Sequence, residues 1–223
     1  MGVLAFDVET RILADEVEER YPSELAGGSA WSRPDLFGFA CGVAVDIDTG
    51  VPRFYALAQA REMIAALESA AGTVGFNSLR FDIPVLTAYG DVSGIYSRHI
   101  DLRAEIKTAL RVSPEAVASG EKLHAGGLNA LSRTNDIGGK TGDGVDAPAL
   151  YRGGKILELL SYCEADVRLT ADLYRLLCEG RLLVEPTYYS EDKRMQFGRR
   201  ITLAAPRSLE ANFRCSSQPP LFS

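Results

Sequence analysis

The chain has 223 residues, of which 46% are hydrophobic, and this is enough to build one domain with a buried core. Its formal net charge of −6 excludes a protein that coats nucleic acid through bulk positive charge, because such binding needs many Lys and Arg contacts to phosphates. No apolar run approaches the ~18 residues of a membrane span, and no basic signal region precedes the first apolar run, so we expect a cytoplasmic protein without a membrane partner.

The first half of the chain predicts strands at its start and then a helix. Residues 3–10 are apolar enough for a buried strand, whereas residues 11–34 are polar and predict an excursion near the site with at most a short helix. Apolar runs at 37–45 and 52–57 flank a turn signal and indicate an antiparallel hairpin. Residues 60–71, rich in Ala, Glu and Leu, predict a helix.

The second half predicts a brief strand at 73–77, a short helix at 82–89 and a further strand at 99–102. Helical patterns follow at 103–110, 127–134 and 155–178. This order indicates an α/β fold with a mixed central sheet of about five strands flanked by helices. We expect a domain over residues 1–185 and a basic, partly disordered C-terminal extension over 186–223.

The four cysteines are far apart and form no Cys-x-x-Cys pair. A structural zinc site and a disulfide framework are therefore not expected. Cys163 and Cys178 lie among apolar residues of a helical pattern, where a cysteine usually acts as a small hydrophobe.

Two acidic residues, Asp7 and Glu9, stand two positions apart in the first strand, so their side chains leave the same face. Like charges at ~4 Å repel by about 4 kcal/mol even at an effective dielectric near 20, and either protonation or a cation must offset this. The alternative is a polar strand end with both groups in water.

A third acidic residue, Asp166, lies on the apolar stripe of the long helix, one turn after Tyr162. A buried carboxylate needs a partner, which is a metal, an Arg side chain, or the end of another element that the carboxylate caps. A fourth, Asp82, follows a strand end, where ligand sites collect in α/β sheets. Asp82 is also a candidate for a plain helix N-cap.

The candidate ligands are thus carboxylates without His or Cys. Hard oxygen ligands of this kind suit Mg²⁺ or Mn²⁺, and two such ions about 3.5–4 Å apart clamp the attacking and leaving oxygens of a phosphodiester.

Three segments resemble, in order and spacing, the exonuclease motifs of the DEDD superfamily, which has a ribonuclease H-like fold. They are Phe6-Asp7-x-Glu9-Thr10, then Gly75-Phe76-Asn77-x-x-x-Phe81-Asp82-x-Pro84, then Tyr162-Cys163-x-x-Asp166-Val167. Tyr162 places the resemblance in the DEDDy branch, which includes the proofreading domains of family B DNA polymerases. Within it the chain looks most like bacterial predicted exonucleases, which also carry a Leu-x-x-Leu segment, here Leu128 to Leu131, and a Lys before the last motif, here Lys140.

The resemblance implies a 3′–5′ exonuclease that releases 5′-mononucleotides from single-stranded DNA or RNA with a free 3′ end. Asp7, Glu9 and Asp166 would bind a first metal ion, Asp7 would bridge to a second that Asp82 supports, and Tyr162 would orient the attacking water. It also implies substrate contacts from Thr10, Asn77 and Phe81. The choice between DNA and RNA stays open.

Two alternative functions compete with that of a 3′–5′ exonuclease. One is a ribonuclease H-like nucleic-acid-binding module without catalysis, against which the retained Tyr162 argues, and the other is an endonuclease of the same fold. Separately, the segment Gln218-Pro219-Pro220-Leu221-Phe222 resembles the Gln-x-x-Leu-Phe peptides that dock on the bacterial sliding clamp, which makes the clamp a predicted partner.

Overall fold

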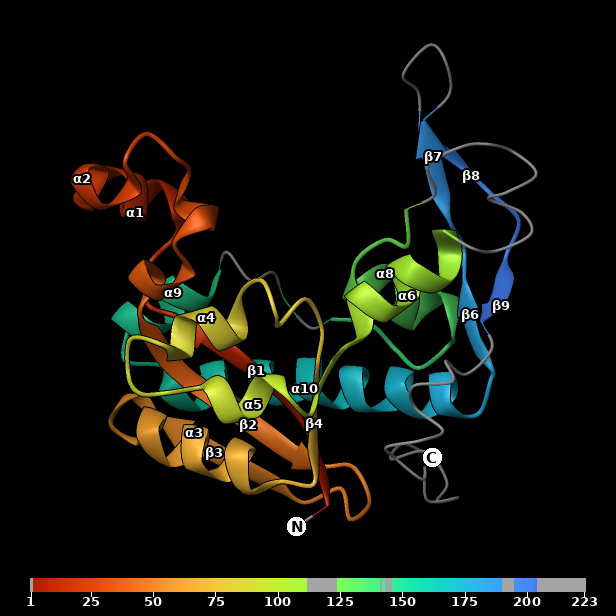
Figure 1. Ribbon diagram of the computed structural model, residues 1–223, viewed down its shortest axis with the longest axis horizontal. Helices are drawn as coiled ribbons and strands as arrows, with labels where there is room; N and C mark the ends of the chain where they lie inside the picture. Colours follow the sequence, from red (N-terminus) through yellow and green to blue (C-terminus); the bar gives the residue numbers. More distant parts are fainter. Residues whose placement is uncertain (1, 112–123, 141, 143–145, 190–194, 204–223) are drawn as a thin grey trace.

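The computed structural model describes residues 2–111, 124–140, 142, 146–189 and 195–203 (Figure 1). Its centre is a five-stranded sheet in the order β3-β2-β1-β4-β5. The strands are β1 (Val3–Thr10), β2 (Phe39–Asp46), β3 (Pro52–Ala56), β4 (Gly72–Gly75) and β5 (His99–Asp101). Strand β2 is antiparallel to β1 and β3, whereas β4 is parallel to β1 and β5 is parallel to β4. The predicted α/β class, mixed sheet and hairpin are confirmed.

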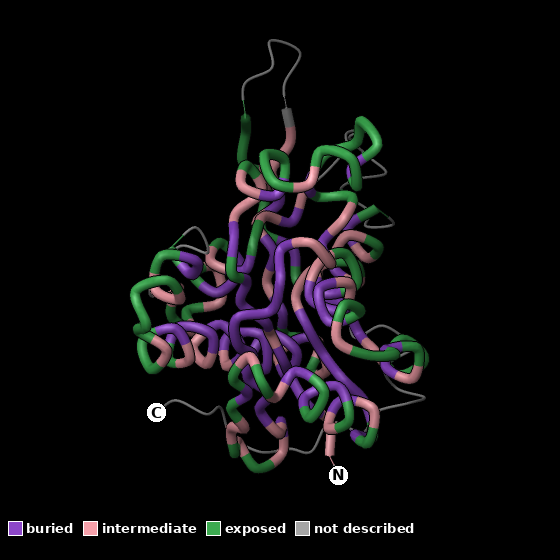
Figure 2. The backbone as a smooth tube through the Cα atoms, turned by 90° about the vertical axis from the view of Figure 1, so that its left-hand side faces the viewer, coloured by how far each residue is buried: buried purple, intermediate pink, exposed green. Residues whose placement is uncertain are grey.

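Two apolar cores lie on opposite faces of this sheet, because alternate residues of β1 point to opposite sides. Leu4, Phe6 and Val8 pack with residues of the first helical layer, and Ala5 packs with residues of the second. The first layer holds α3 (Ala60–Ser69), which follows β3 through η3 (Leu57–Gln59), and α4 (Asp82–Leu86) and α5 (Ser93–Tyr96), which follow β4. The second holds α6 (Leu102–Arg111), α8 (Leu128–Thr134) and α10 (Ile156–Cys178). The buried segments occupy the centre of the molecule (Figure 2).

The long helix α10 crosses one face of the sheet and packs against β1 and β2. Its burial pattern places Leu159, Tyr162 and Asp166 on the inward face, as the spacing of three and four residues predicts. A short helix, α9 (Ala147–Arg152), packs against α10 and the end of β1. The end of β1 therefore lies between two helices that are distant from it in sequence.

The segment that follows β1 is more regular than the sequence predicts. It forms α1 (Ala14–Arg20), α2 (Pro22–Leu25), η1 (Ala30–Ser32) and η2 (Pro34–Phe37), so the expectation of at most a short helix is wrong. These turns are stabilised by a small core of their own that includes Val17, Leu25 and Phe37. Because its apolar residues are sparse and widely spaced, the segment shows no helical period in the sequence. In Figure 1 α1 and α2 lie together at one end of the molecule, above α9.

The described part of the predicted C-terminal extension forms strands. Strand β9 (Ile201–Leu203) pairs with β6 (Leu182–Val184), and β8 (Met195–Phe197) pairs with β7 (Thr187–Tyr189). Ile201 and Leu203 are buried in the same core as α10, so this strand belongs to the body of the domain. The predicted clamp-binding segment, residues 218–222, lies outside the described residues. Among the described helices, none combines the length and apolarity that crossing a bilayer requires.

Candidate metal-binding site

The carboxylates of Asp7 and Glu9 leave β1 on the side that faces α10. Ala5, two residues before Asp7, packs in the core on that side, and the strand alternation continues to Glu9. The register of β1 against β2 shifts between Glu9 and Thr10, as a β-bulge does, and bulges are frequent next to active sites. One ligand atom from each of Asp7, Glu9 and Cys163 lies within 4.8 Å of the other two. Glu9 is buried, which excludes the alternative of a strand end with both groups in water.

Asp82 reaches the same site from the edge of β1 that pairs with β4. The pairing of β4 with β1 extends only from Val3 to Ala5, so the later residues of β1 have no strand partner on that edge. The backbone N–H of Val8 donates instead to Asp82 Oδ1 at 3.0 Å. The N-cap of α4 is Phe81, so Asp82 is not the helix N-cap, and its side chain hydrogen-bonds to Asp7.

Asp166 completes the group from α10. It is buried, and its Oδ2 lies 2.6 Å from Lys140 Nζ, while its Oδ1 is buried without a hydrogen-bond partner among the described residues. The basic partner is thus Lys140, the residue that the resemblance singled out, rather than an Arg. Tyr162 lies one helical turn before Asp166, with Lys140 Nζ 5.4 Å from its ring centre. The hydroxyl of Tyr162 is also buried, next to Lys140 and Asp166.

Burial and mutual repulsion make it unfavourable for all four carboxyl groups to be ionised at once. Burial, reinforced by the charges of Asp82, Glu9 and Asp166, holds the pKa of Asp7 well above its ordinary value. Burial likewise raises the pKa of Glu9 well above its ordinary value, and raises the pKa of Asp82 to about 6. The pKa of Asp166 is raised by burial, against the opposing effect of Lys140.

Among the residues that the structure describes, one ammonium group therefore faces four carboxyl groups at this site. The site must take up protons or bind cations to be stable at neutral pH. The donor set fits a hard divalent cation, because it is dominated by carboxylate oxygens, and the unpartnered Asp166 Oδ1 is a free ligand atom within it. Asp7, Glu9, Asp82 and Asp166 would hold such ions. Cys163 contributes a sulfur to the same group, close to the ligand atoms of Asp7 and Glu9, with Sγ 3.4 Å from the backbone oxygen of Asp7.

The three residues expected to contact substrate surround the acidic group, but each has a partner within the protein. The Thr10 hydroxyl donates to the backbone oxygen of Ile12 at 3.3 Å. Asn77 has a positive φ of 68°, and its Oδ1 accepts a hydrogen bond from Arg103 at 2.9 Å. Phe81 belongs to a cluster of aromatic rings described next.

Three aromatic rings cluster beside Asp82. The Phe81 ring centre lies 5.2 Å from that of Phe37 and 5.8 Å from that of Trp31, and the rings are tilted or edge-to-face to one another. Trp31 is 64% exposed, so its ring is open to solvent. Both added rings come from the segment after β1, which places that segment at the site, as expected.

Sequence reasoning assigned Asp101 only to a strand, whereas the structure makes it a positioning group. Its buried carboxylate accepts hydrogen bonds from the backbone N–H groups of Asn77, Leu79 and Ala104. It therefore fixes the loop between β4 and α4 on which Asn77 and Asp82 stand. An acidic residue at the carboxyl end of a predicted strand was the only signal for this role.

No known protein-family model matches this sequence, and a search of curated proteins gives no match either. Any assignment of function consequently depends on the residues and geometry of the site.

Proposed function

We propose that this protein is a DEDDy-type 3′–5′ exonuclease with a ribonuclease H-like fold, which hydrolyses phosphodiester bonds at single-stranded DNA or RNA ends and releases 5′-mononucleotides. One observation carries the proposal. Asp7, Glu9, Asp82 and Asp166 converge from β1, α4 and α10 into one largely buried group that has more carboxyl groups than cations to balance them. Structural carboxylates are normally paired one to one with cations, and here one Lys faces four.

The central sheet supports the fold part of the proposal. A mixed sheet of five strands with helices on both faces is the architecture that the motif resemblance implies. Asp7 and Glu9 stand near the carboxyl end of β1, and Asp82 follows the carboxyl end of β4, where α/β folds collect ligands.

The residues divide naturally into ligands and positioning groups. Two Mg²⁺ or Mn²⁺ ions, when bound, would polarise the phosphodiester and activate the attacking water. Asp7 lies between Glu9 and Asp82, and so is the natural ligand for both ions. The Tyr162 hydroxyl, buried next to Lys140 and Asp166, would hydrogen-bond to the attacking water and orient it. Lys140 holds Asp166 in place and limits the excess of negative charge.

The test is a cleavage assay on DNA and RNA strands labelled at the 5′ end, each with Mg²⁺, Mn²⁺ or EDTA. A ladder that shortens from the 3′ end with metal, and its absence in EDTA, is the expected result. Internal cuts would indicate the endonuclease, and intact strands that still bind would indicate the non-catalytic module. Either result would overturn the proposal.

Two variants and one control sharpen this assay. Asp7→Ala and Asp82→Ala should abolish cleavage while the far-UV circular dichroism spectrum is unchanged. Glu62→Gln removes an exposed carboxylate of α3, away from the acidic group, and should cleave at the rate of the wild type.

A further inference from the structure

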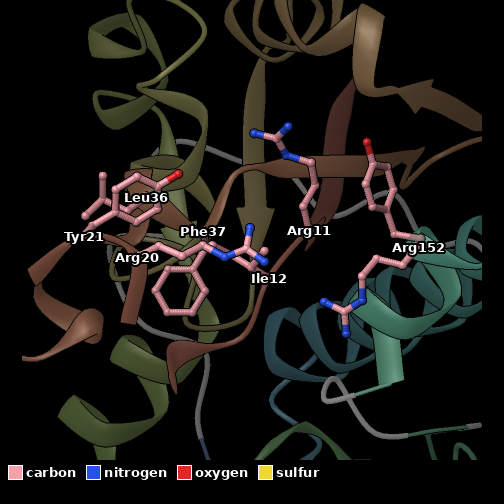
Figure 3. Close-up of a pocket in the computed structure, with 8 residues that line it drawn as sticks. Arg11, Ile12, Arg20, Tyr21, Leu36, Phe37 and Arg152 are labelled. Atoms are coloured by element: carbon pink, nitrogen blue, oxygen red, sulfur yellow. The ribbon is translucent and has the colours of Figure 1, made fainter. Parts of the chain in front are cut away.

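A pocket of about 230 Å³ lies between α9 and the segment that follows β1 (Figure 3). Three arginines line it, namely Arg11, Arg20 and Arg152, together with the rings of Tyr21 and Tyr151. The arginines come from three separate elements: the chain after β1, α1 and α9. A volume of this size would hold about seven or eight waters at ~30 Å³ each, which is ample for a phosphate and part of its sugar.

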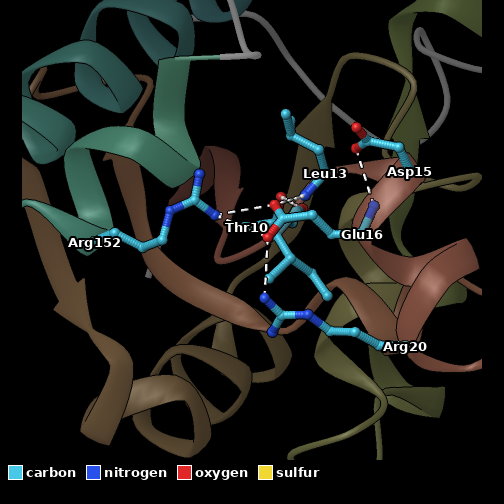
Figure 4. A network of polar contacts seen from close by, with 7 residues as sticks. Thr10, Leu13, Asp15, Glu16, Arg20 and Arg152 are labelled. Atoms are coloured by element: carbon cyan, nitrogen blue, oxygen red, sulfur yellow. Dashed lines mark hydrogen bonds and ion pairs between the residues drawn. The ribbon is translucent and has the colours of Figure 1, made fainter.

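The charge of this pocket is opposite to that of the neighbouring acidic group. Arg20 and Arg152 share the carboxylate of Glu16, at 3.1 and 3.0 Å, and Figure 4 shows Glu16 between them. Within the described part of the chain, the guanidinium of Arg11 makes no ion pair. Three positive charges therefore face one negative charge. Because Glu16 is shared, it holds two guanidinium groups in position without neutralising both.

The pocket is connected to the candidate metal-binding site along two routes. Arg11 follows Glu9 by two residues, so their Cα atoms are at most about 7 Å apart. Phe37 lines the pocket and contacts Phe81, whose neighbour in the chain is Asp82. A nucleic-acid strand whose end lies at the carboxylates is thus within reach of the arginines.

We propose that this pocket binds a backbone phosphate of the nucleic-acid substrate, upstream of the bond that is cut. The inference rests on the proposed function for its choice of ligand. Arginine forks bind phosphate oxygens through paired, charge-assisted hydrogen bonds, and a protein with a net charge of −6 needs local positive charge to hold a polyanion. The tyrosine rings and Phe37 provide apolar surface for the attached sugar or base.

Substitution of Glu16 should change the affinity for nucleic acid in the opposite direction to substitution of an arginine. Its carboxylate competes with a phosphate for Arg20 and Arg152, so Glu16→Gln should tighten binding. The glutamine oxygen can still accept the hydrogen bond from the backbone of Leu13, which keeps the start of α1 intact. A variant that merely loosened the structure would weaken binding instead.

The experiment measures fluorescence anisotropy of labelled single-stranded DNA and RNA 12-mers in EDTA, where metal-dependent cleavage is absent. Arg11→Gln and Arg152→Gln should each weaken binding roughly three- to tenfold, the loss of one charge-assisted contact. Each should also reduce the slope of log affinity against log salt by about 0.7, as expected for one phosphate on a single strand. Glu16→Gln should bind more tightly than the wild type, and Arg61→Gln on α3 should bind equally.

Equal affinity of the wild type, Arg11→Gln and Arg152→Gln would overturn the proposal. A second readout separates this failure from failure of the proposed function. Hydrolysis of the p-nitrophenyl ester of thymidine 5′-monophosphate needs only the metal-binding site, so both Arg variants should retain its rate while losing kcat/KM on oligonucleotides. If no substrate is hydrolysed but binding in EDTA still depends on the arginines, the exonuclease assignment fails and the phosphate pocket stands.

Discussion

Replacing Asp82 by Asn should stabilise the metal-free protein at high pH, although Asp82 is fully enclosed and hydrogen-bonded. Asparagine has the shape of a protonated aspartate. Its oxygen can accept the hydrogen bond from Val8, and its amide can donate to the carboxyl group of Asp7, which in the wild type donates to Asp82. A hydrogen bond to each partner is therefore retained, the one to Asp7 with its direction reversed, and residue 82 loses its ability to become negatively charged.

The magnitude follows from the pKa of Asp82, which burial raises to about 6 from the ordinary value of 3.8. Below about pH 3 the carboxyl group is protonated in both the folded and the unfolded chain and adds no pH dependence. As the pH rises from about 4 to about 6, the unfolded chain releases its proton first, so the free energy of unfolding falls. The difference between the two pKa values corresponds to about 3 kcal/mol in the free energy of unfolding, and this stability is fully lost above pH ~7.

The assay is urea unfolding of wild type and Asp82→Asn in EDTA between pH 4 and pH 8. The difference in stability between the two proteins should be small at pH 4 and should grow to about 3 kcal/mol in favour of the variant at pH 8. Mn²⁺ at ~100 times its dissociation constant should add about 2.7 kcal/mol to the wild type at pH 8 and much less to the variant. Parallel pH profiles for the two proteins would refute the account of Asp82 as a strained, buried carboxyl group.

Three further changes test other parts of the structure. Lys140→Met removes the cation beside Asp166 and should lower the free energy of unfolding by roughly 1.5–3 kcal/mol at pH 8, with a smaller loss in acid where Asp166 is protonated; urea unfolding at both pH values measures this. Asp101→Ala leaves three backbone N–H groups without their acceptor, so the melting temperature should fall and the KM for oligonucleotides should rise more than kcat falls. Gly42→Ala should cost about 1–3 kcal/mol in a thermal melt, because its Cβ would lie 2.5 Å from the sulfur of Met63 and overpack the core.

The strands and long helices were predictable because their signals are local. The apolar run of β1, the turn between β2 and β3 and the three-and-four spacing of α10 each follow from the residues of one element. The helical turns after β1 were missed because their few apolar residues, such as Val17 and Leu25, are widely spaced and form a core only once the segment has folded. Strand β9 was missed for the same reason, since its short apolar pattern has meaning only beside β6.

The site was predictable where a single residue in its local pattern already indicates the chemistry. A carboxylate on an apolar helical stripe must have a partner, which made Asp166 conspicuous before its neighbours were known. The identity of the partner could not be derived in this way, because Lys140 lies in a Gly-rich connection without a period of its own, and only the family resemblance suggested it. The arginine pocket was hidden for a similar reason, since Arg11 and Arg152 are ordinary surface residues until the chain brings them together.

The acidic group can persist only because β1 is anchored independently of it. Leu4 and Ala5 of the strand pair with both β2 and β4 and bury their side chains in the two opposite cores, whereas the part that carries Asp7 and Glu9 pairs, among the described strands, with β2 alone. The repulsion among the carboxylates therefore acts on the less constrained end of a strand whose other end is fixed. A cation that relieves this repulsion should reduce hydrogen exchange at Val8 and Glu9 far more than at Leu4. Equal protection of these amides with and without Mn²⁺ would show that the charge of the site is not coupled to the strand that carries it.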